Sequence, residues 1–445
     1  MKGVLSMATL QEKHVKFNSK MVVSNTGGNL SSDAGLILVK EFMDSLGFYS
    51  FAKQFLHFKE DRIYWTHDNI SLLEQLLFQL IAGYSADSSA NLLKEDPIFR
   101  LVLDKEAIAS QASLSRFWDR ISEENIAQFQ ELNQAMLDKV RIERNNTQMI
   151  IDLDSTHSDT FGNQEKTDYN AHYGTQGYHP LVAFDGLTGD FLKAELRSGN
   201  VYTSKGVKDF LAPMLTHYRQ VLPSTDILVR GDSCFATPEV YDTCESNGSF
   251  YAIRLKSNKV VEKLAESFVL VGDDHPWEER EVHYYSAFYQ ANSWSQKRRI
   301  CIKSTREANH LVFSHEYVVT NLHDELSAKT IFQIYHKRGT MENFIKEAKN
   351  GFYFDKTDSS SFLENHAWMM VSLLAYNLVN FMKTICLPEK EATFQVDTLR
   401  LRLFKVAGKL VRSGRSLLLR MSSSHVYQDL FYQSLDKIQQ LSWQA

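Results

Sequence analysis

Residues 335–349 read YHKRGTMENFIKEAK, and this stretch decides how the chain is interpreted. It places the following residues three, four and seven positions apart: Tyr335, Arg338, Glu342 and Lys349. On an α-helix, which turns by about 100° per residue, these side chains fall in one stripe roughly 60° wide. We therefore expect one helix face to carry a carboxylate among basic groups. The alternative is an ordinary solvated face of mixed charge.

Three neighbouring residues refine this expectation. Lys346 joins the stripe, whereas Glu347, the nearest other carboxylate, points roughly 120° away. Gly339 lies inside the stripe and is expected to kink the helix. A single acid among cations suits a metal-dependent enzyme that acts on a phosphate backbone, because the acid can hold a metal ion while the basic groups hold phosphates.

The same stretch follows the pattern Y-x2-R-x3-E-x6-K. This pattern resembles the signature of the DDE transposases of bacterial insertion sequences. The variant RGTMEN followed by IKE is most similar to the insertion-sequence 1380 family, whose core is related to the piggyBac transposases. The resemblance implies that Glu342 is the third catalytic carboxylate and that two catalytic aspartates lie upstream, each at a strand.

The first aspartate is expected in QMIIDLDSTHSDTFG, residues 148–162. The apolar run 149–153 predicts a buried strand. Asp152 and Asp154 are two residues apart, so they project from the same face and periodicity does not choose between them. The family pattern, Asp-x-Thr with Gly eight residues after the Asp, fits Asp154 and not Asp152, so the resemblance selects Asp154. The alternative is that one of these aspartates only caps a turn.

The second aspartate is expected in TDILVRGDSCFATPEVY, residues 225–241. The run 227–229 predicts a short strand, and Gly231 allows a tight exit from it. Asp232 then lies at the carboxyl end of the strand, where sites gather in α/β sheets. Arg-Gly-Asp-Ser resembles the corresponding family motif. An adhesion function for Arg-Gly-Asp is disfavoured because an apolar strand leads straight into it.

The order of the expected elements indicates the fold class. A strand at 149–154 is followed by a hairpin at 178–196, a helix near 207–218, the strand that ends at Asp232 and, much later, the helix that carries Glu342. This order matches an α/β, ribonuclease H-like catalytic core. Residues after the first aspartate that also resemble the family are Gln164, His172, Tyr173, Gly177 and Pro180.

We divide the chain into five parts. The ribonuclease H-like core is expected in two pieces, 146–250 and 327–385. A helical region at 1–145, for DNA binding and assembly, precedes it. A β-rich insertion domain at 251–326 interrupts it, because a bare core does not need the 110 positions between the last two candidate carboxylates. A basic helical region at 386–445 follows. Within it, residues 398–428 hold no acidic residue and resemble an amphipathic helix; the alternative is a solvated helix without a ligand.

DNA contacts are expected beyond the stripe. Trp294 in the insertion is a candidate for stacking on a flipped base, although a tryptophan in a β domain more often fills a core. Arg116 belongs to a short helix that suits a helix-turn-helix, unless Phe117 and Trp118 simply fill a core. The full set of expected DNA-binding residues is Tyr335, Arg338, Lys346, Lys349, Arg254, Lys256, Trp294 and Arg116.

Composition agrees with a large intracellular protein. The chain has 445 residues, 43% of them hydrophobic, and its formal net charge is -5. DNA binding must therefore come from local basic patches. The four cysteines form no C-x2-C pair, which disfavours a zinc site and indicates a reducing compartment, the cytoplasm. The longest apolar stretch, MMVSLLAYNLVNFM, is too short to span a bilayer, so no membrane partner is expected.

The resemblance implies a DNA transposase that binds terminal inverted repeats, cleaves the ends of its element and joins them to target DNA. Asp154, Asp232 and Glu342 are expected to hold two Mg²⁺ ions, with Mn²⁺ as a substitute. The partners are double-stranded DNA and a second copy of the chain, as a homodimer on DNA. Two alternatives remain: a nuclease with the same core that does not join strands, and an inactive, domesticated DNA-binding protein. The presence of all three carboxylates argues against the second.

Overall fold

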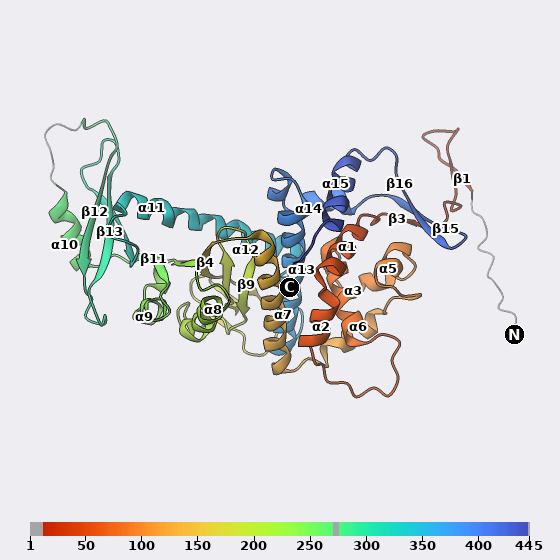
Figure 1. The fold of residues 1–445 in the computed structure, drawn as a ribbon, viewed down its shortest axis with the longest axis horizontal. Coiled ribbons are helices and arrows are strands. Elements are labelled where there is room, and N and C mark those ends of the chain that lie inside the picture. Colours follow the sequence, from red (N-terminus) through yellow and green to blue (C-terminus); the bar gives the residue numbers. More distant parts are fainter. Residues whose placement is uncertain (1–11, 270–275, 444–445) are drawn as a thin grey trace. The chain divides into compact units, whose positions relative to one another are not determined.

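The computed structural model describes residues 12–269 and 276–443. The ends of the predicted first and last regions and a short part of the insertion therefore lie outside the described residues. The chain forms two compact units. Figure 1 shows the whole chain, coloured from red at the N-terminus to blue at the C-terminus. The helical unit comprises Met1–Tyr49, Arg62–Phe117 and Cys386–Leu441. The sheet unit comprises Ser50–Asp61, Trp118–Ile385 and Ser442–Ala445.

The helical unit is built from short helices and small strands. In its first part these are β1 (Lys13–His14), β2 (Val22–Val23), β3 (Leu30–Ser31), α1 (Leu36–Leu46), α3 (Asn69–Ala82), α4 (Ser89–Leu93), α5 (Pro97–Val102) and α6 (Gln111–Trp118), with α2 (Phe48–Phe55) crossing the unit boundary. Helix α3 is buried along its whole length. It begins where the Asp68 side chain accepts a hydrogen bond from the Ser71 N–H and ends at Gly83, whose φ is +90°.

The C-terminal part of the helical unit corrects a prediction. It contains η3 (Glu391–Thr393), α14 (Val396–Leu399), the π-helical turn η4 (Arg400–Phe404), β15 (Gly408–Ser413), β16 (Ser416–Met421) and α15 (Gln428–Gln439). Residues 408–421 form an antiparallel hairpin and not an amphipathic helix. Gly414, with φ of +60°, makes the turn, and β15 pairs with β3.

The sheet unit begins with a long helix and contains most of the strands. Its elements are α7 (Glu123–Arg144), β4 (Gln148–Ser155), β5 (Ser158–Asp159), β6 (Asp168–Asn170), β7 (Thr175–Tyr178), β8 (Leu181–Asp185), β9 (Phe191–Glu195), α8 (Val207–Val221), β10 (Asp226–Gly231), η1 (Ser233–Phe235), α9 (Pro238–Ser246), β11 (Phe250–Leu255), α10 (Lys259–Phe268), β12 (Glu281–Tyr289), β13 (Arg298–Arg306), β14 (Ser314–Thr320), α11 (Ala328–His336), η2 (Lys337–Thr340), α12 (Met341–Phe352) and α13 (Phe362–Cys386). The predicted strand, hairpin, helix and strand around the two aspartates are all present.

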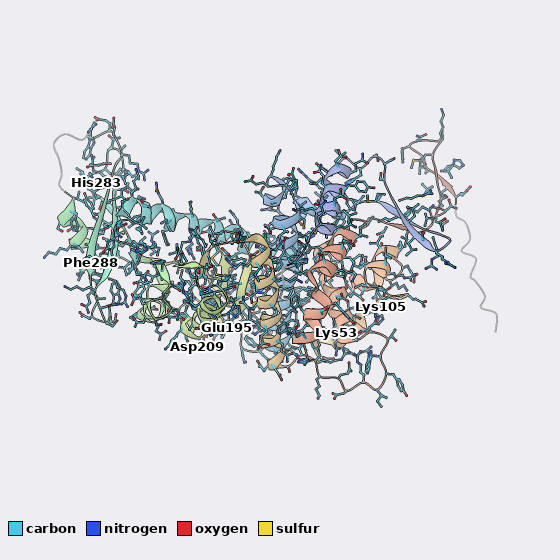
Figure 2. The ribbon with its side chains drawn as sticks, in the orientation of Figure 1. Lys53, Lys105, Glu195, Asp209, His283 and Phe288 are labelled. Carbon is cyan, nitrogen blue, oxygen red and sulfur yellow. The ribbon has the colours of Figure 1, made fainter. Side chains whose placement is uncertain are left out.

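Within the described residues, one mixed sheet has the strand order β12-β13-β14-β11-β10-β4-β8-β9. Strand β10 pairs in parallel with both β4 and β11, while the outer strands on each side are antiparallel. Strands β11 to β14, which cover most of the expected β-rich insertion, therefore continue the same sheet. The added strands end at β12, which carries His283 and the 64% exposed Phe288 (Figure 2).

Helix α13 is fixed to the sheet unit by a buried amide network. Asn377 Nδ2 donates to Asn133 Oδ1 of α7 at 2.7 Å and to the Phe191 carbonyl of β9 at 2.8 Å. The Asn377 Oδ1 accepts from the Phe191 N–H at 2.8 Å. Helix α13 has 25 residues and is longer than the apolar stretch noted in the sequence. By length and composition alone, it could cross a membrane. However, 89% of the apolar window is buried inside the protein, as in a core helix.

His366 on α13 provides a pH-dependent test of this packing. Burial, with a smaller contribution from Lys166, lowers its pKa from 6.5 to about 4, and its Nε2 accepts a hydrogen bond from the Leu196 N–H. Between pH 6.5 and 4 the imidazole of His366 is protonated in the unfolded chain but stays neutral in the folded protein. Protonation therefore favours the unfolded chain, and the free energy of unfolding falls as the pH decreases from 6.5 toward 4. We expect a loss of about 2 kcal/mol between pH 6.5 and 5.

The measurement is urea unfolding of the sheet unit at both pH values. His366→Gln, which keeps a hydrogen-bond acceptor, should flatten the pH dependence. His310→Gln, at an exposed position, is the matched control and should leave it unchanged. The same dependence in wild type and His366→Gln would show that another group is responsible.

Candidate active site

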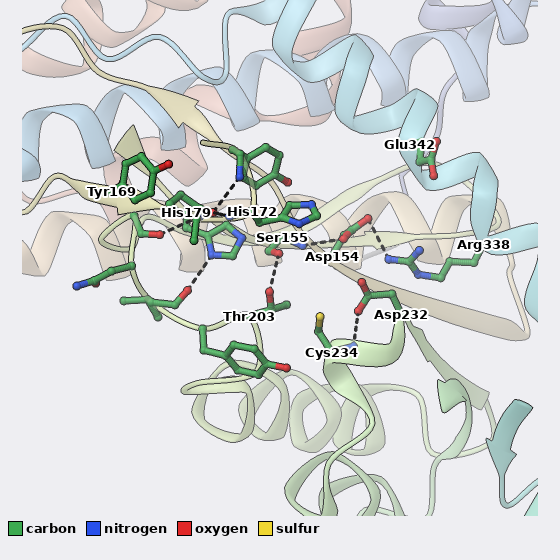
Figure 3. Close-up of a pocket in the computed structure, with 17 residues that line it drawn as sticks. Asp154, Ser155, Tyr169, His172, His179, Thr203, Asp232, Cys234, Arg338 and Glu342 are labelled. Carbon is green, nitrogen blue, oxygen red and sulfur yellow. Dashed lines mark hydrogen bonds and ion pairs between the residues drawn. The ribbon is translucent and has the colours of Figure 1, made fainter. Parts of the chain in front are cut away.

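Asp154 and Asp232 lie at the carboxyl ends of two adjacent parallel strands. The last register pairs of β4 and β10 are Asp152 with Arg230 and Leu153 with Gly231, so the two aspartates follow directly after the paired residues. Both line an open pocket of about 660 Å³, as Glu342 does (Figure 3). The carboxyl ends of parallel strands are where ligands bind in α/β sheets.

The structure distinguishes the two aspartates of β4. Asp152 is fully buried, and both of its carboxylate oxygens accept hydrogen bonds from the Arg230 guanidinium at 2.7 Å. Gly186 makes room for this pair, since a Cβ there would lie 2.5 Å from Asp152 Oδ2 and 2.6 Å from Arg230 Nη2. Asp152 is therefore neutralised inside the sheet, and Asp154 is the aspartate of β4 that lines the pocket.

Backbone N–H groups orient both pocket aspartates. Asp154 Oδ1 accepts from the Ser155 N–H at 2.9 Å, and Asp232 Oδ1 accepts from the Cys234 N–H at 2.9 Å. Burial raises the pKa of Asp154, and the nearby charge of Asp232 raises it further, while Arg338 opposes the shift. Two carboxylates held this close favour a cation between them, because each disfavours the charge of the other.

Glu342 reaches the pocket from a separate element. Residues 335–349 do not form one continuous α-helix: α11 ends at His336, the 3-10 turn η2 follows, and α12 begins at Met341. Gly339 lies in this turn, as expected for a kink. Figure 3 shows Glu342 on α12 beyond Arg338. Within the described ranges, no three acidic, histidine or cysteine side chains are close enough to form a ready-made metal site.

Arg338 and Lys349 both make contacts within the protein. Arg338 donates to the Leu153 carbonyl and forms an ion pair with Asp154, each at 2.9 Å. Lys349 donates to the His157 carbonyl and lies 3.6 Å from Asp355. Both basic groups therefore support the end of β4 in this arrangement, whereas Lys346 is exposed to solvent.

Two aromatic residues expected to contact DNA are buried instead. Tyr335 is 8% exposed and packs in a core cluster with Ile331 and Phe332. Trp294 is 6% exposed and packs edge-on against Tyr241. These positions correct the expected DNA contact of Tyr335 and the expected base stacking of Trp294.

The remaining expected DNA-binding residues are exposed. Arg254 lies on β11, which pairs with the strand that leads into Asp232, and Lys256 follows just after β11. Arg254 lies 3.6 Å from Glu316. Arg116 is exposed on α6 of the helical unit, where Phe117 fills the core. The structure thus brings Asp154, Asp232, Glu342 and Arg338 together around one pocket.

Aromatic residues also line the pocket. His172 and Tyr173 were noted in the sequence, whereas Tyr169, His179 and Tyr202 were not. The available signal was local: aromatic residues alternate with Asn and Gly in the loops that follow the first aspartate. Residues 199–203 and residues 169–173 are distant in the sequence and meet only in the folded chain, so no local pattern predicted their contact.

Comparison with known proteins supports these observations. The family model described as transposase DDE domain group 1 matches residues 13–443. No curated protein matches the chain. Among solved structures, the piggyBac transposase synaptic complex with hairpin DNA is similar at 10% identity and a TM-score of 0.43, covering 83% of this chain and 80% of that one.

A second solved structure, the Mos1 transposase paired-end complex with left transposon end, is similar at 11% identity and a TM-score of 0.17, covering 48% of this chain and 75% of that one. The family assignment rests on the family model, which extends over nearly all of the sequence and contains the three carboxylates at the pocket. The chain belongs to the DDE transposase domain family, group 1.

Proposed function

We propose that this protein is a DNA transposase that binds the terminal inverted repeats of its element, cleaves the element ends and joins them to target DNA. The observation that carries the proposal is the placement of Asp154 and Asp232 at adjacent strand ends, with Glu342 on the same pocket. The proposal includes the insertion-sequence 1380 family, a bacterial source and a cytoplasmic location.

The proposal also includes a ribonuclease H-like core. The supporting feature is the sequence of elements from β4 through the β8–β9 hairpin, α8 and β10 to the carboxylate-bearing α12. The parallel pair β4–β10 positions two carboxylates from the sheet, and α12 supplies the third.

Asp154, Asp232 and Glu342 are the residues that would hold the metal ions. Carboxylate oxygens suit Mg²⁺, which binds through a few such ligands and retains several waters. When bound, a pair of Mg²⁺ ions activates an oxygen nucleophile and stabilises the leaving oxygen of a phosphodiester. In the present arrangement Arg338 pairs with Asp154 Oδ2 and the Ser155 N–H donates to Oδ1, so each oxygen keeps a lone pair that could bind a metal ion.

The protein groups then have separate tasks. The ends of β4 and β10 fix the directions of two carboxylates through backbone N–H groups. Arg338 can donate to a phosphate oxygen beside them, since its buried Nε has no hydrogen-bond partner within the described residues. Water is the nucleophile in cleavage, and the freed 3′ hydroxyl is the nucleophile in joining.

The proposal is tested with DNA that carries both ends of the element encoding the chain. Cleavage and joining should require Mg²⁺ or Mn²⁺, and Ca²⁺ should support binding with little cleavage, because Ca²⁺ prefers looser, higher coordination. Products are separated on sequencing gels. Cleavage that continues in the presence of a strong chelator would contradict the metal-dependent account.

The joining step separates the proposal from its nearest alternative. A nuclease with the same core would release the element ends but form no joined product in a strand-transfer assay. We also propose that the active complex contains two copies of the chain, since two element ends must be processed together and a symmetric dimer supplies two sites. Light scattering of the DNA complex measures this stoichiometry.

Lys346 provides a test of the DNA-binding face of α12. It is exposed one turn after Glu342, so we expect it to neutralise one phosphate. Lys346→Gln should reduce the slope of log affinity against log salt by about 0.9, which corresponds to one phosphate contact. Lys263→Gln, at an exposed position of α10 away from the pocket, is the matched control. Equal slopes for Lys346→Gln and wild type would favour a solvated face.

A further inference from the structure

The hairpin of β15 and β16 projects from the helical unit as a two-stranded ribbon. Its base is held by β3, which pairs with β15 only at Gly408 and Lys409, and by the Asn29 carbonyl, which accepts from the Leu410 N–H at 3.1 Å. Beyond this base, no third strand within the described residues pairs with the hairpin. Figure 1 shows the ribbon extending away from α1 and α15. The outer part of the ribbon is therefore accessible to another molecule.

The two faces of the ribbon differ, since residues opposite each other in an antiparallel pair share a face. One face packs on the helical unit at its base, where a Cβ at Gly408 would lie 2.5 Å from the Cβ of the buried Ala34. The opposite face, which we call the ribbon face, consists of three cross-strand pairs: Lys409 with Arg420, Val411 with Leu418, and Ser413 with Ser416. All of these side chains except Val411 are exposed.

The ribbon face carries positive charge that the described residues do not neutralise. Lys409 and Arg420 lie directly opposite each other, and like charges in that position disfavour the pairing of two strands. Within the described ranges, neither side chain forms an ion pair or a hydrogen bond. Arg412 and Arg415 add two exposed cations to the hairpin, and residues 398–428 contain no acid. An anion bound between Lys409 and Arg420 would relieve their repulsion.

The dimensions and side chains of the ribbon indicate which polyanion it fits. Two paired strands lie about 4.8 Å apart. With its side chains, such a ribbon fits the major groove of duplex DNA, which is about 12 Å wide, and is too broad for the minor groove at about 6 Å. Residues 408–421 include no aromatic side chain on which the bases of a single strand could stack. The tip at 413–416 is polar, whereas insertion into a membrane requires an apolar surface.

We infer that the ribbon face binds in the major groove of duplex DNA. Lys409 and Arg420 each contact a phosphate at the edge of the groove. Val411 and Leu418 lie over the base edges, where they can contact thymine methyl groups, which the major groove displays. The inference rests on the proposed function, because a transposase must bind duplex DNA. It adds a DNA contact on the helical unit, whereas the three carboxylates belong to the sheet unit.

The test measures the affinity of the full-length protein for a short fluorescent DNA duplex over a series of salt concentrations. Lys409→Gln/Arg420→Gln should reduce the slope of log affinity against log salt by about 1.8, which corresponds to two phosphate contacts. The variant should melt like the wild type, because it removes two charges that repel each other. Lys390→Gln/Lys437→Gln, which removes the same charge from exposed positions elsewhere in the helical unit, is the matched control and should keep the wild-type slope.

Groove-binding dyes test the position of the ribbon on the duplex. Methyl green, which occupies the major groove, should weaken DNA binding by the wild type more than by Lys409→Gln/Arg420→Gln. Netropsin, which occupies the minor groove, should affect both proteins equally. An unchanged salt slope in the double variant would overturn the inference, as would a selective effect of netropsin on the wild type. An unchanged slope together with lost binding to phosphatidylglycerol vesicles would assign the ribbon to a membrane surface instead.

The outcome is separable from that of the proposed function. A reduced salt slope in the double variant, without metal-dependent cleavage of element ends by the wild type, would refute the transposase proposal alone. Metal-dependent cleavage by the wild type, with an unchanged salt slope in the double variant, would refute the groove contact alone.

Discussion

Asp154→Asn and Asp232→Asn should each reduce cleavage of element ends on the order of a thousandfold or more, while DNA binding and folding persist. The reason is the loss of a charged ligand at the strand ends, where several kcal/mol of transition-state stabilisation are at stake. Both side chains line the pocket and neither is in the closed core. The substitutions keep the size of the side chain, and Asn can still accept one of the two contacts that Asp154 accepts, so folding should persist and gel-shift affinity should stay close to that of the wild type.

Glu342→Gln should behave in the same way, because Glu342 faces the same pocket. Glu325→Gln, which changes an exposed carboxylate outside the pocket lining, is the matched control. Full cleavage by Asp154→Asn would show that this residue is not a catalytic carboxylate. Retained cleavage in all three pocket variants would show that this pocket is not the active site.

Arg230→Met should lower the stability of the sheet unit by about 3–5 kcal/mol, since it leaves the fully buried Asp152 carboxylate without its partner. Arg230 also donates to the Ile334 carbonyl at 2.7 Å and so holds the end of α11 near the pocket. Urea unfolding followed by tryptophan fluorescence measures the loss.

The double variant Arg230→Met/Asp152→Leu is the informative control. It removes both charges, so it should recover much of the stability lost in the single variant. Cleavage should remain impaired, because the contact with Ile334 is still missing. A single variant as stable as wild type would mean that the buried pair does not hold β4 and β10 together as the structure indicates.

Local signals were enough to predict the strands around the candidate site. Apolar runs lead into Asp154 and Asp232, and these runs predicted the two strands that carry the aspartates. The choice of Asp154 over Asp152 required the resemblance. In the structure the two aspartates differ because Asp152 pairs with Arg230, a residue 78 positions away in the chain.

Other features depended on contacts that no local pattern encodes. The residues of β11 to β14 favour strands, but the sequence alone does not predict that β11 pairs with β10 and so joins the core sheet. The acid-free stretch 398–428 resembled an amphipathic helix, whereas pairing between β15 and β16 makes part of it a hairpin. Trp294 suited DNA stacking by type, and its burial followed from packing against Tyr241.

The most direct test of the account is mapping of the metal site with Fe²⁺, which can replace Mg²⁺. With added hydrogen peroxide and ascorbate, bound Fe²⁺ reduces the peroxide to hydroxyl radicals that cut the polypeptide nearby. Cuts in the protein bound to element-end DNA are located by mass spectrometry. The account predicts clusters next to Asp154, Asp232 and Glu342, suppressed by excess Mg²⁺ and absent in Asp154→Asn. Cuts confined to other segments, or cuts that excess Mg²⁺ leaves unchanged, would contradict a single metal site shared by these three carboxylates.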